Sequence, residues 1–356
     1  MIDITDAHAS NVASIPPPTK SGELKLRNPL FPGSVSRPGG GTKSSVKNSY
    51  SQVSFSIGWH VPSNPAICLT NSLKNQWKSY RKQLRECQKD FSETSVHQLR
   101  VATRRLMTYY ALVGSVASGD KVSKARKKLK RHLKSLGRLR DAQVQRLFIE
   151  EQMGRFPFLV LVRDFLAERE QHLVKDIARK VERFKSRKLE QWTLNLCQEL
   201  SESPVQWGKR AVFATDLFRA MADAFRQTAY CRQTIDPADV QTIHRTRVAF
   251  KKFRYMVEAL SPDFTGLGKR GLRRLGNYQR RMGHLQDLEI LQNCLAQFLQ
   301  EHPGNEEVFA PFCHYIHLRR NRGLRSCLTH ANDLFEFWDS ARLGQTYPDA
   351  LSRTAA

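Results

Sequence analysis

The sequence predicts an all-α protein that contains two copies of one helical unit behind a disordered N-terminal tail. Three observations support this prediction. Apolar residues recur at helical spacing, and strand-like alternation is hard to find beyond about residue 65. Two short motifs occur twice in the same order. The first 60 residues differ from the rest in composition.

The N-terminal segment, residues 1–60, is rich in Pro, Gly, Ser and Asn, and it includes Pro16, Pro17, Pro18 and the glycine run 39–41. Such a composition buries too little apolar surface to offset the entropy of ordering, so we expect a disordered tail. We place the first helical half at 61–205, the second at 206–345 and a C-terminal tail at 346–356.

Helical periodicity and breaker residues predict the elements in order. Each half has room for about four helices. Pro204, Pro237, Pro262 and Pro303 lie at or near expected breaks. Helix entry is indicated by Ser92-Glu93-Thr94-Ser95 and by Asp236-Pro237. The expected helices cover 68–90, 94–114, 121–151, 157–183, 187–201, 211–231, 238–260, 268–301 and 306–338.

The internal repeat is the strongest structural signal. The segment from Val96 to Leu112 resembles the segment from Ile243 to Leu260 at an offset of 147 residues. Further along, Leu136–Asp141 matches Met282–Asp287 at an offset of 146 residues. Two motifs that repeat in register indicate a duplicated unit.

Positive charge is concentrated in the repeated segments. The chain has 58 Lys and Arg against 33 Asp and Glu, a net charge of +25. Residues 100–140 and 244–281 together carry 21 of these 25 charges. A helix face that is only solvated would be expected to mix opposite charges, which stabilise a helix at a spacing of four residues. These faces are almost purely positive, and like charges at that spacing destabilise the helix. The charge pattern therefore predicts a polyanionic ligand.

Helical geometry places these cations on faces opposite the apolar residues. The first motif contributes one cationic stripe in each copy. The second motif, with the segment before it, contributes another, next to Asp141 in the first copy and Asp287 in the second. We interpreted the two aspartates as structural partners of these cations. The candidate ligand-binding residues are His97, Arg100, Arg104, Arg105, Lys127, Lys130, Arg131, Lys134, Arg138, His244, Arg247, Lys251, Lys252, Arg254, Arg273, Arg280 and His284.

The cysteines and the apolar runs of the sequence indicate the cellular compartment of the protein. Seven scattered cysteines without a CxxC pair favour a reducing compartment and argue against a structural zinc site. No signal peptide is recognisable, and the longest apolar runs are too short for a membrane span. We therefore expect a cytoplasmic protein without a metal or cofactor.

The motifs resemble those of the CHAD family, the conserved histidine α-helical domain. The family motif begins His-x-x-Arg and continues with two further cations, as in His97 and Arg100 or His244 and Arg247. The resemblance covers about residues 65–340. It implies two four-helix bundles, related by pseudo-twofold symmetry, around a basic channel that binds inorganic polyphosphate and can bring proteins to polyphosphate granules. Met107 and Ala142-Gln143 depart from the family pattern.

Chemistry independent of the resemblance also favours a polymer of phosphate alone. Arginine suits bidentate contact with phosphate oxygens. Recognition of nucleobases would need stacking aromatic residues among the cations, and the basic faces contain hardly any. RNA or DNA backbone binding remains the alternative, since the same electrostatics would serve it.

We expect a binding protein rather than an enzyme. A phosphoacceptor role for His97 or His244 is the weaker alternative, because the His-x-x-Arg pattern on a bundle helix also resembles histidine phosphotransfer proteins. No glycine-rich nucleotide-binding loop or kinase-like motif accompanies it. A histidine among arginines is more simply a ligand contact.

Overall fold

The computed structural model describes residues 60–338, except for 118, 183, 185, 203–206 and 266. Every regular element in this part is helical, so the all-α prediction is confirmed. The tails expected at 1–60 and 346–356 lie outside the described residues, apart from His60.

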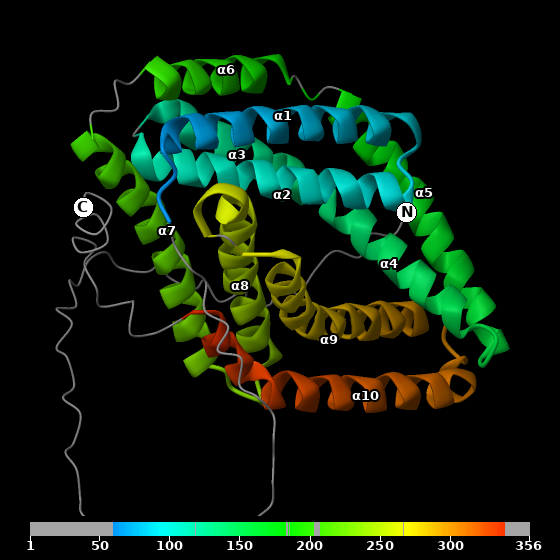
Figure 1. The fold of residues 1–356 in the computed structure, drawn as a ribbon. Helices are drawn as coiled ribbons and strands as arrows, with labels where there is room; N and C mark the ends of the chain where they lie inside the picture. The colour runs from blue at the N-terminus through cyan, green and yellow to red at the C-terminus, as the bar shows by residue number, and fades with distance from the viewer. Residues whose placement is uncertain are drawn as a thin grey trace, which may run out of the picture. The chain divides into compact units, whose positions relative to one another are not determined.

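The elements follow the predicted order (Figure 1). The first half contains α1 (Pro65–Asp90), α2 (Glu93–Val116), α3 (Asp120–Ser135), α4 (Gly137–Gln152), the 3-10 turn η1 (Pro157–Leu159), α5 (Val160–Glu182) and α6 (Arg187–Glu202). The second half contains α7 (Trp207–Gln233), α8 (Val240–Leu260), the π-helical turn η2 (Ser261–Thr265), α9 (Lys269–Glu301), α10 (Glu306–Thr329) and the 3-10 segment η3 (Ala331–Phe337).

The two helices that carry the first motif have similar neighbours in the two halves. The helix α1 packs on α2 and α7 packs on α8, so each first-motif helix has the preceding helix as its neighbour. The second motif lies on α4 in one half and on α9 in the other. In addition, α2 packs directly against α8. This arrangement is compatible with the predicted duplication.

Two apolar cores hold the helices together. The larger one joins α1–α6 to α7–α9, so it continues across both halves. The smaller one lies where α4 and α5 meet α9 and α10, on the right of Figure 1. Its aromatic rings pack in edge and tilted arrangements, for example Phe156 with Phe312 at a centroid distance of 5.3 Å. The smaller core fixes α4 relative to α10.

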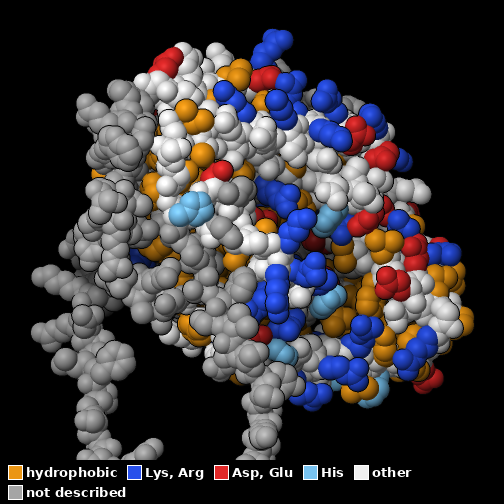
Figure 2. Space-filling view, viewed as in Figure 1, with side chains coloured by type: hydrophobic (Ala, Val, Ile, Leu, Met, Phe, Trp, Pro, Cys, Tyr) orange, Lys and Arg blue, Asp and Glu red, His pale blue; other side chains and the backbone are white. Residues whose placement is uncertain are grey.

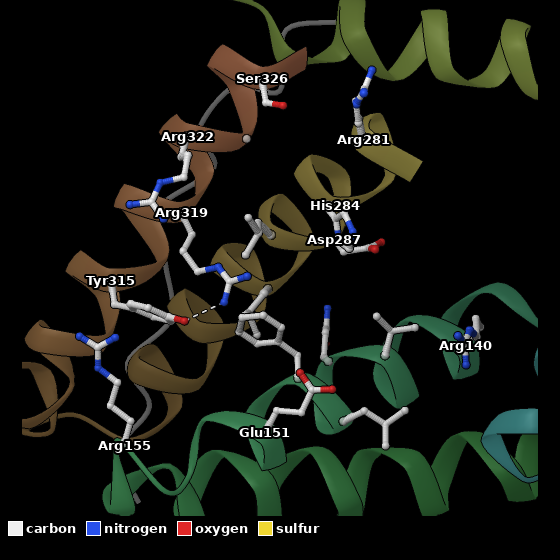
Figure 3. Close-up of a pocket in the computed structure, with 17 residues that line it drawn as sticks. Arg140, Glu151, Arg155, Arg281, His284, Asp287, Tyr315, Arg319, Arg322 and Ser326 are labelled. Atoms are coloured by element: carbon white, nitrogen blue, oxygen red, sulfur yellow. Dashed lines mark hydrogen bonds between the residues drawn. The ribbon is translucent and has the colours of Figure 1, made fainter. Parts of the chain in front are cut away.

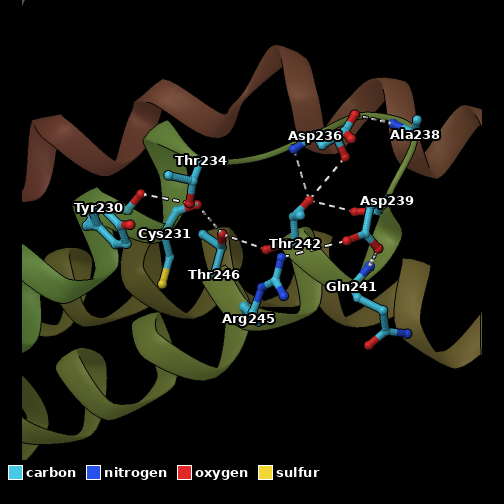
Figure 4. A network of polar contacts seen from close by, with 10 residues as sticks. All are labelled: Tyr230, Cys231, Thr234, Asp236, Ala238, Asp239, Gln241, Thr242, Arg245 and Thr246. Atoms are coloured by element: carbon cyan, nitrogen blue, oxygen red, sulfur yellow. Dashed lines mark hydrogen bonds and ion pairs between the residues drawn. The ribbon is translucent and has the colours of Figure 1, made fainter. Parts of the chain in front are cut away.

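Both first-motif helices begin at polar caps. Ser92 accepts a hydrogen bond from the Ser95 backbone N–H at 3.2 Å. Asp239 accepts from the Gln241 backbone N–H at 2.9 Å, and Asp236 contacts the Thr242 hydroxyl in the preceding turn (Figure 4). The entry signal at Asp236-Pro237 was therefore placed a few residues before the observed cap.

The helix expected at 121–151 is interrupted, which corrects the prediction of one continuous helix. The interruption lies at Leu136, between the end of α3 and the start of α4. The Leu133 carbonyl in the last turn of α3 accepts a hydrogen bond from Arg100 Nη1 at 3.0 Å. Arg100 thereby satisfies a carbonyl of a helix end.

The equivalent helix α9 runs without a break through Gly283. The helix expected at 306–338 likewise ends at Thr329 and is followed by η3. Within the described ranges, none of the helices combines the length and apolarity needed to cross a membrane.

Candidate functional site

Cations of the repeated first motif meet where α2 packs against α8. Burial lowers the pKa of Arg104, Tyr255 beside it opposes this shift, and the positive charge of Arg247 adds to it. Burial and the charge of Arg104 lower the pKa of Arg100 to about 10. We call Arg100, Arg104, Arg247 and Lys251 the central cluster. The two copies of the motif thus form one site.

Lys251 is the most perturbed cation of the central cluster. Burial lowers its pKa to about 6, and the charges of Arg104, Arg247 and Arg100 lower it further, against the opposing effect of Asp287. With this pKa its amine is mostly neutral at pH 7. An anion placed here would favour the ammonium form, so the cluster is electrostatically prepared for negative charge.

Arg100 and Arg247 are equivalent in sequence but differ in their hydrogen bonds. Arg100 donates to the Leu133 carbonyl at the end of α3. Arg247 faces the continuous helix α9, and its Nε is buried without a hydrogen-bond partner. A buried donor without a partner costs free energy. An acceptor supplied by a ligand would remove that cost.

The two motif histidines are held in different ways. His244 Nδ1 forms a hydrogen bond with the side-chain oxygen of Gln286, at the position that corresponds to Arg140. The His97 side chain is exposed at the surface. Partial desolvation and the positive charge of Arg140 nevertheless lower its pKa. Burial also lowers the pKa of His244. Both imidazoles are therefore predominantly neutral near pH 7.

Asp141 and Asp287 are not paired with the cations, in contrast to our interpretation from the sequence. Neither carboxylate is within 4.0 Å of a basic nitrogen in the described part of the chain. Both side chains are solvent-accessible, yet desolvation raises the pKa of each. Accessibility combined with desolvation is expected for groups that line a hollow. The charge of Arg100 opposes the shift most strongly at Asp141, and the charge of Arg247 does so at Asp287.

The predicted cations at the C-terminal end of the first motif lie beside an acidic residue. Arg105 is within 3.6 Å of Glu258, and Arg254 Nε donates to the same carboxylate at 2.6 Å. Lys252 is exposed. Because Glu258 already neutralises part of this charge, Arg105 and Arg254 contribute less field to the central cluster than their number suggests.

The remaining predicted cations are not brought into the cluster by any described contact. They lie exposed along α3, at the start of α4 and along the first half of α9. Arg280, for example, donates to Asn277 at 3.1 Å. The break at Leu136 also separates the α3 cations from the α4 face with which the sequence had aligned them. The residues concerned are Lys127, Lys130, Arg131, Lys134, Arg138, Arg273 and Arg280.

Basic side chains gather around a hollow near the centre of the view in Figure 2. A cavity of about 840 Å³ lies between α4, α9 and α10, and it is lined by Arg140, His284 and Asp287 among others. Arg140 and Asp287 interact electrostatically with the central cluster. The cavity is therefore electrostatically coupled to the cluster, and of the predicted site residues only His284 lines its wall.

Sequence reasoning missed several cavity residues (Figure 3). Arg140 pairs with Glu93 and lies next to Asp141 in the second motif, so its position in the motif could have identified it. Four others lie outside the matched motifs, and of these only Arg281 belongs to a segment in which positive charge is concentrated. They are Arg155, Arg281, Arg319 and Arg322.

Among the residues that the structure describes, no group of three or more His, Cys, Asp or Glu side chains is arranged to hold a metal ion. The described side chains of the site carry guanidinium, ammonium, imidazole and carboxylate groups.

Comparison with known proteins places these features in context. The sequence model of the CHAD domain matches residues 71–296. The crystal structure of the CHAD domain from the plant Ricinus communis is similar, with a TM-score of 0.59 and 19% identity over 78% of this chain and 94% of that chain. PptA from Streptomyces chartreusis aligns with a TM-score of 0.48 and 14% identity over 78% of this chain and all of that chain. No curated protein matches the sequence.

Proposed function

The chain belongs to the CHAD domain family, and on this basis we propose that it binds inorganic polyphosphate at the central cluster. The observation that carries the proposal is the convergence of Arg100 and Arg104 from α2 with Arg247 and Lys251 from α8. The pKa values of Arg100, Arg104 and Lys251 are lowered by burial and by the neighbouring positive charges, and none of the four cations forms an ion pair among the described residues. A linear polyanion would release its counterions on binding and would relieve their mutual repulsion.

We propose further that the polymer runs through a basic channel formed by the central cluster and the adjoining cavity. Arg140 and Asp287 support this path, since they line the cavity and interact with the cluster. The exposed cations of α3 and α9 would then guide the polymer by long-range attraction rather than by direct contact.

The proposed activity is binding rather than catalysis, in the cytoplasm, and recruitment to polyphosphate granules would follow from it. The absence of a kinase-like motif in the sequence favours a ligand contact over phosphotransfer. Incubation with radiolabelled phosphodonors should leave His97 and His244 unlabelled. Stable label on either histidine would contradict a purely binding role.

A competition experiment tests the proposal. Labelled long-chain polyphosphate is bound to the full chain and displaced by unlabelled polyphosphate or by RNA of equal total charge, at matched ionic strength. We expect polyphosphate to displace the label at lower concentration, because the four convergent cations of the central cluster suit closely spaced phosphates. Equal or better displacement by RNA would favour the nucleic-acid alternative.

A further inference from the structure

Two arginines of the cavity are held in place by aromatic rings. The guanidinium of Arg319 on α10 lies 5.6 Å from the ring centroids of both Phe148 and Tyr315, and its Nη1 donates to the Tyr315 hydroxyl at 2.7 Å. The guanidinium of Arg155 lies 4.9 Å from the Tyr315 centroid and 5.2 Å from the Phe156 centroid. These contacts fix the planes of both groups without using most of their N–H donors.

Neither arginine has a carboxylate partner in the described part of the chain, and both are exposed. Neighbouring arginines differ in this respect. On the same helix Arg320 pairs with Glu289, and on α4 Arg146 pairs with Glu150 and Glu170. The charges of Arg155 and Arg319 are therefore oriented but not neutralised, which suits them to an anionic or planar ligand.

The cavity wall is also partly apolar, which a polymer of phosphate alone would not require. Its apolar side chains are Val144, Leu147, Phe148, Leu288 and Leu291. Its volume, about 840 Å³, lies in the range of small-molecule sites. From Tyr315 to Ser326, the lining residues on α10 span about 16 Å of helix. The cavity thus has room for a ligand with an apolar part and an anionic part.

Glu151 adds a hydrogen-bond acceptor to this apolar and aromatic end. It lies one helical turn from Phe148 on α4, it lines the cavity, and it is exposed without an ion pair among the described residues (Figure 3). A carboxylate here disfavours phosphate nearby but accepts hydrogen bonds from an amino group. The exocyclic amino group of a nucleobase is such a donor.

We infer that this cavity binds a nucleoside polyphosphate. The base lies at the aromatic end, stacked on the Arg319 guanidinium or on Phe148, with Glu151 accepting a hydrogen bond from its amino group. The phosphates extend past Arg140 and His284 toward the central cluster. The inference rests on the proposed function only in this last respect, namely that the central cluster holds phosphates.

The test compares ATP with inorganic tripolyphosphate, which has the same number of phosphates and no nucleoside. Isothermal titration calorimetry without divalent cations is performed on the full chain and on Phe148→Leu, with Phe335→Leu as the control. Phe335 is 40% exposed on η3 and does not line the cavity, so the control makes the same chemical change elsewhere. Thermal denaturation verifies that each variant is folded.

We expect the wild type to bind ATP about five- to tenfold more tightly than tripolyphosphate, which corresponds to the lower part of the range for base stacking. Phe148→Leu should remove this preference while leaving tripolyphosphate affinity unchanged, and Phe335→Leu should retain it. Glu151→Gln should weaken ATP binding without weakening tripolyphosphate binding, and it provides a second probe if Phe148→Leu fails to fold.

Equal affinity of the wild type for the two ligands would overturn the inference, as would an equal loss of both in Phe148→Leu. Failure of the proposed function gives a different result. In that case labelled long-chain polyphosphate does not bind, while the preference for ATP and its loss in Phe148→Leu are still observed. That outcome would support the cavity as a nucleotide site and refute the central cluster as a polyphosphate site.

Discussion

Arg247 lies against Gly283, with its Nε and Nη2 atoms each 3.7 Å from the position that a Cβ atom on this glycine would occupy. The equivalent pair in the other half has the same geometry, since Arg100 Nη1 lies 3.7 Å from the Cβ position of Gly137. In both copies, the glycine of the second motif therefore leaves the space in which the arginine of the first motif packs. This contact explains why the two motifs occur together.

A large side chain at Gly283 is expected to displace Arg247. We predict that Gly283→Leu weakens polyphosphate binding by about 1.5–3 kcal/mol, the contribution of a hydrogen bond to a charged group. Gly276→Leu on the same helix is the matched control, because nothing lies within 4 Å of its Cβ position. Fluorescence anisotropy with labelled polyphosphate measures both. Equal affinities of the two variants would contradict the role of the glycine.

Alanine at the same position should act differently. A Cβ atom at 3.7 Å makes an ordinary van der Waals contact, so Gly283→Ala leaves Arg247 in place. Inside a helix, Ala is more favourable than Gly by about 0.5–1 kcal/mol. We expect Gly283→Ala to unfold at a higher denaturant concentration with unchanged polyphosphate affinity. A loss of affinity as large as that of Gly283→Leu would show that the arginine cannot tolerate even a methyl group.

The lowered pKa of Lys251 predicts that ligand binding takes up a proton. Its pKa is about 6 in the free protein and is ordinarily 10.5, and a bound polyanion should raise it again. Polyphosphate affinity should therefore increase as pH falls from 8 toward 6. Calorimetry in buffers of different ionisation enthalpy measures the proton uptake, which Lys251→Met should reduce. Affinity and proton uptake that are independent of Lys251 would exclude this mechanism.

The same pKa affects the stability of the free protein in the opposite direction. Between pH 6 and 10.5 the unfolded state binds a proton at Lys251 that the folded state does not. The free energy of unfolding should therefore rise with pH, by at most about 1.4 kcal/mol per unit from this group. Urea denaturation at several pH values should show this slope in the wild type and a smaller slope in Lys251→Met. Identical slopes would contradict the assignment.

The smaller apolar core should determine how firmly the cavity is held. Phe312 is fully buried in contact with Phe156, and its replacement by Ala should cost about 3–5 kcal/mol of stability. Because this core joins α4 to α10, the variant should also lose affinity for ligands of the cavity. Denaturant unfolding of Phe312→Ala, with the exposed Phe335→Ala as control, measures the effect. A loss of stability below about 1 kcal/mol would show that this core does not hold α4 and α10 together.

The periodicity of apolar residues made the helical class predictable from the sequence, and the repeated motifs aligned His97 with His244. They also identified Arg100, Arg104, Arg247 and Lys251, which the structure brings together. Side chains that are periodic within one helix can be assigned to a face from spacing alone. The sequence therefore predicted well which side chains share a face of one helix.

Relations between elements were not recoverable in the same way. The break at Leu136 depends on the Arg100 contact with the Leu133 carbonyl, which local spacing does not contain. Arg155 and Arg319 both contact the Tyr315 ring, because the smaller core brings the turn after α4 next to α10. Likewise, tertiary placement determines that Asp141 forms no ion pair among the described residues although arginines surround it. These features required the packing of helices that are distant in sequence.

Direct contact between Arg247 and the bound polyphosphate is tested most directly by the salt dependence of binding. Affinities of the wild type, Arg247→Ala and Arg187→Ala are measured over a series of salt concentrations, Arg187 being an exposed cation at the start of α6. We predict that Arg247→Ala lowers affinity and reduces the slope of log affinity against log salt by about 1, whereas Arg187→Ala changes neither. Wild-type affinity and slope in Arg247→Ala would contradict the claim.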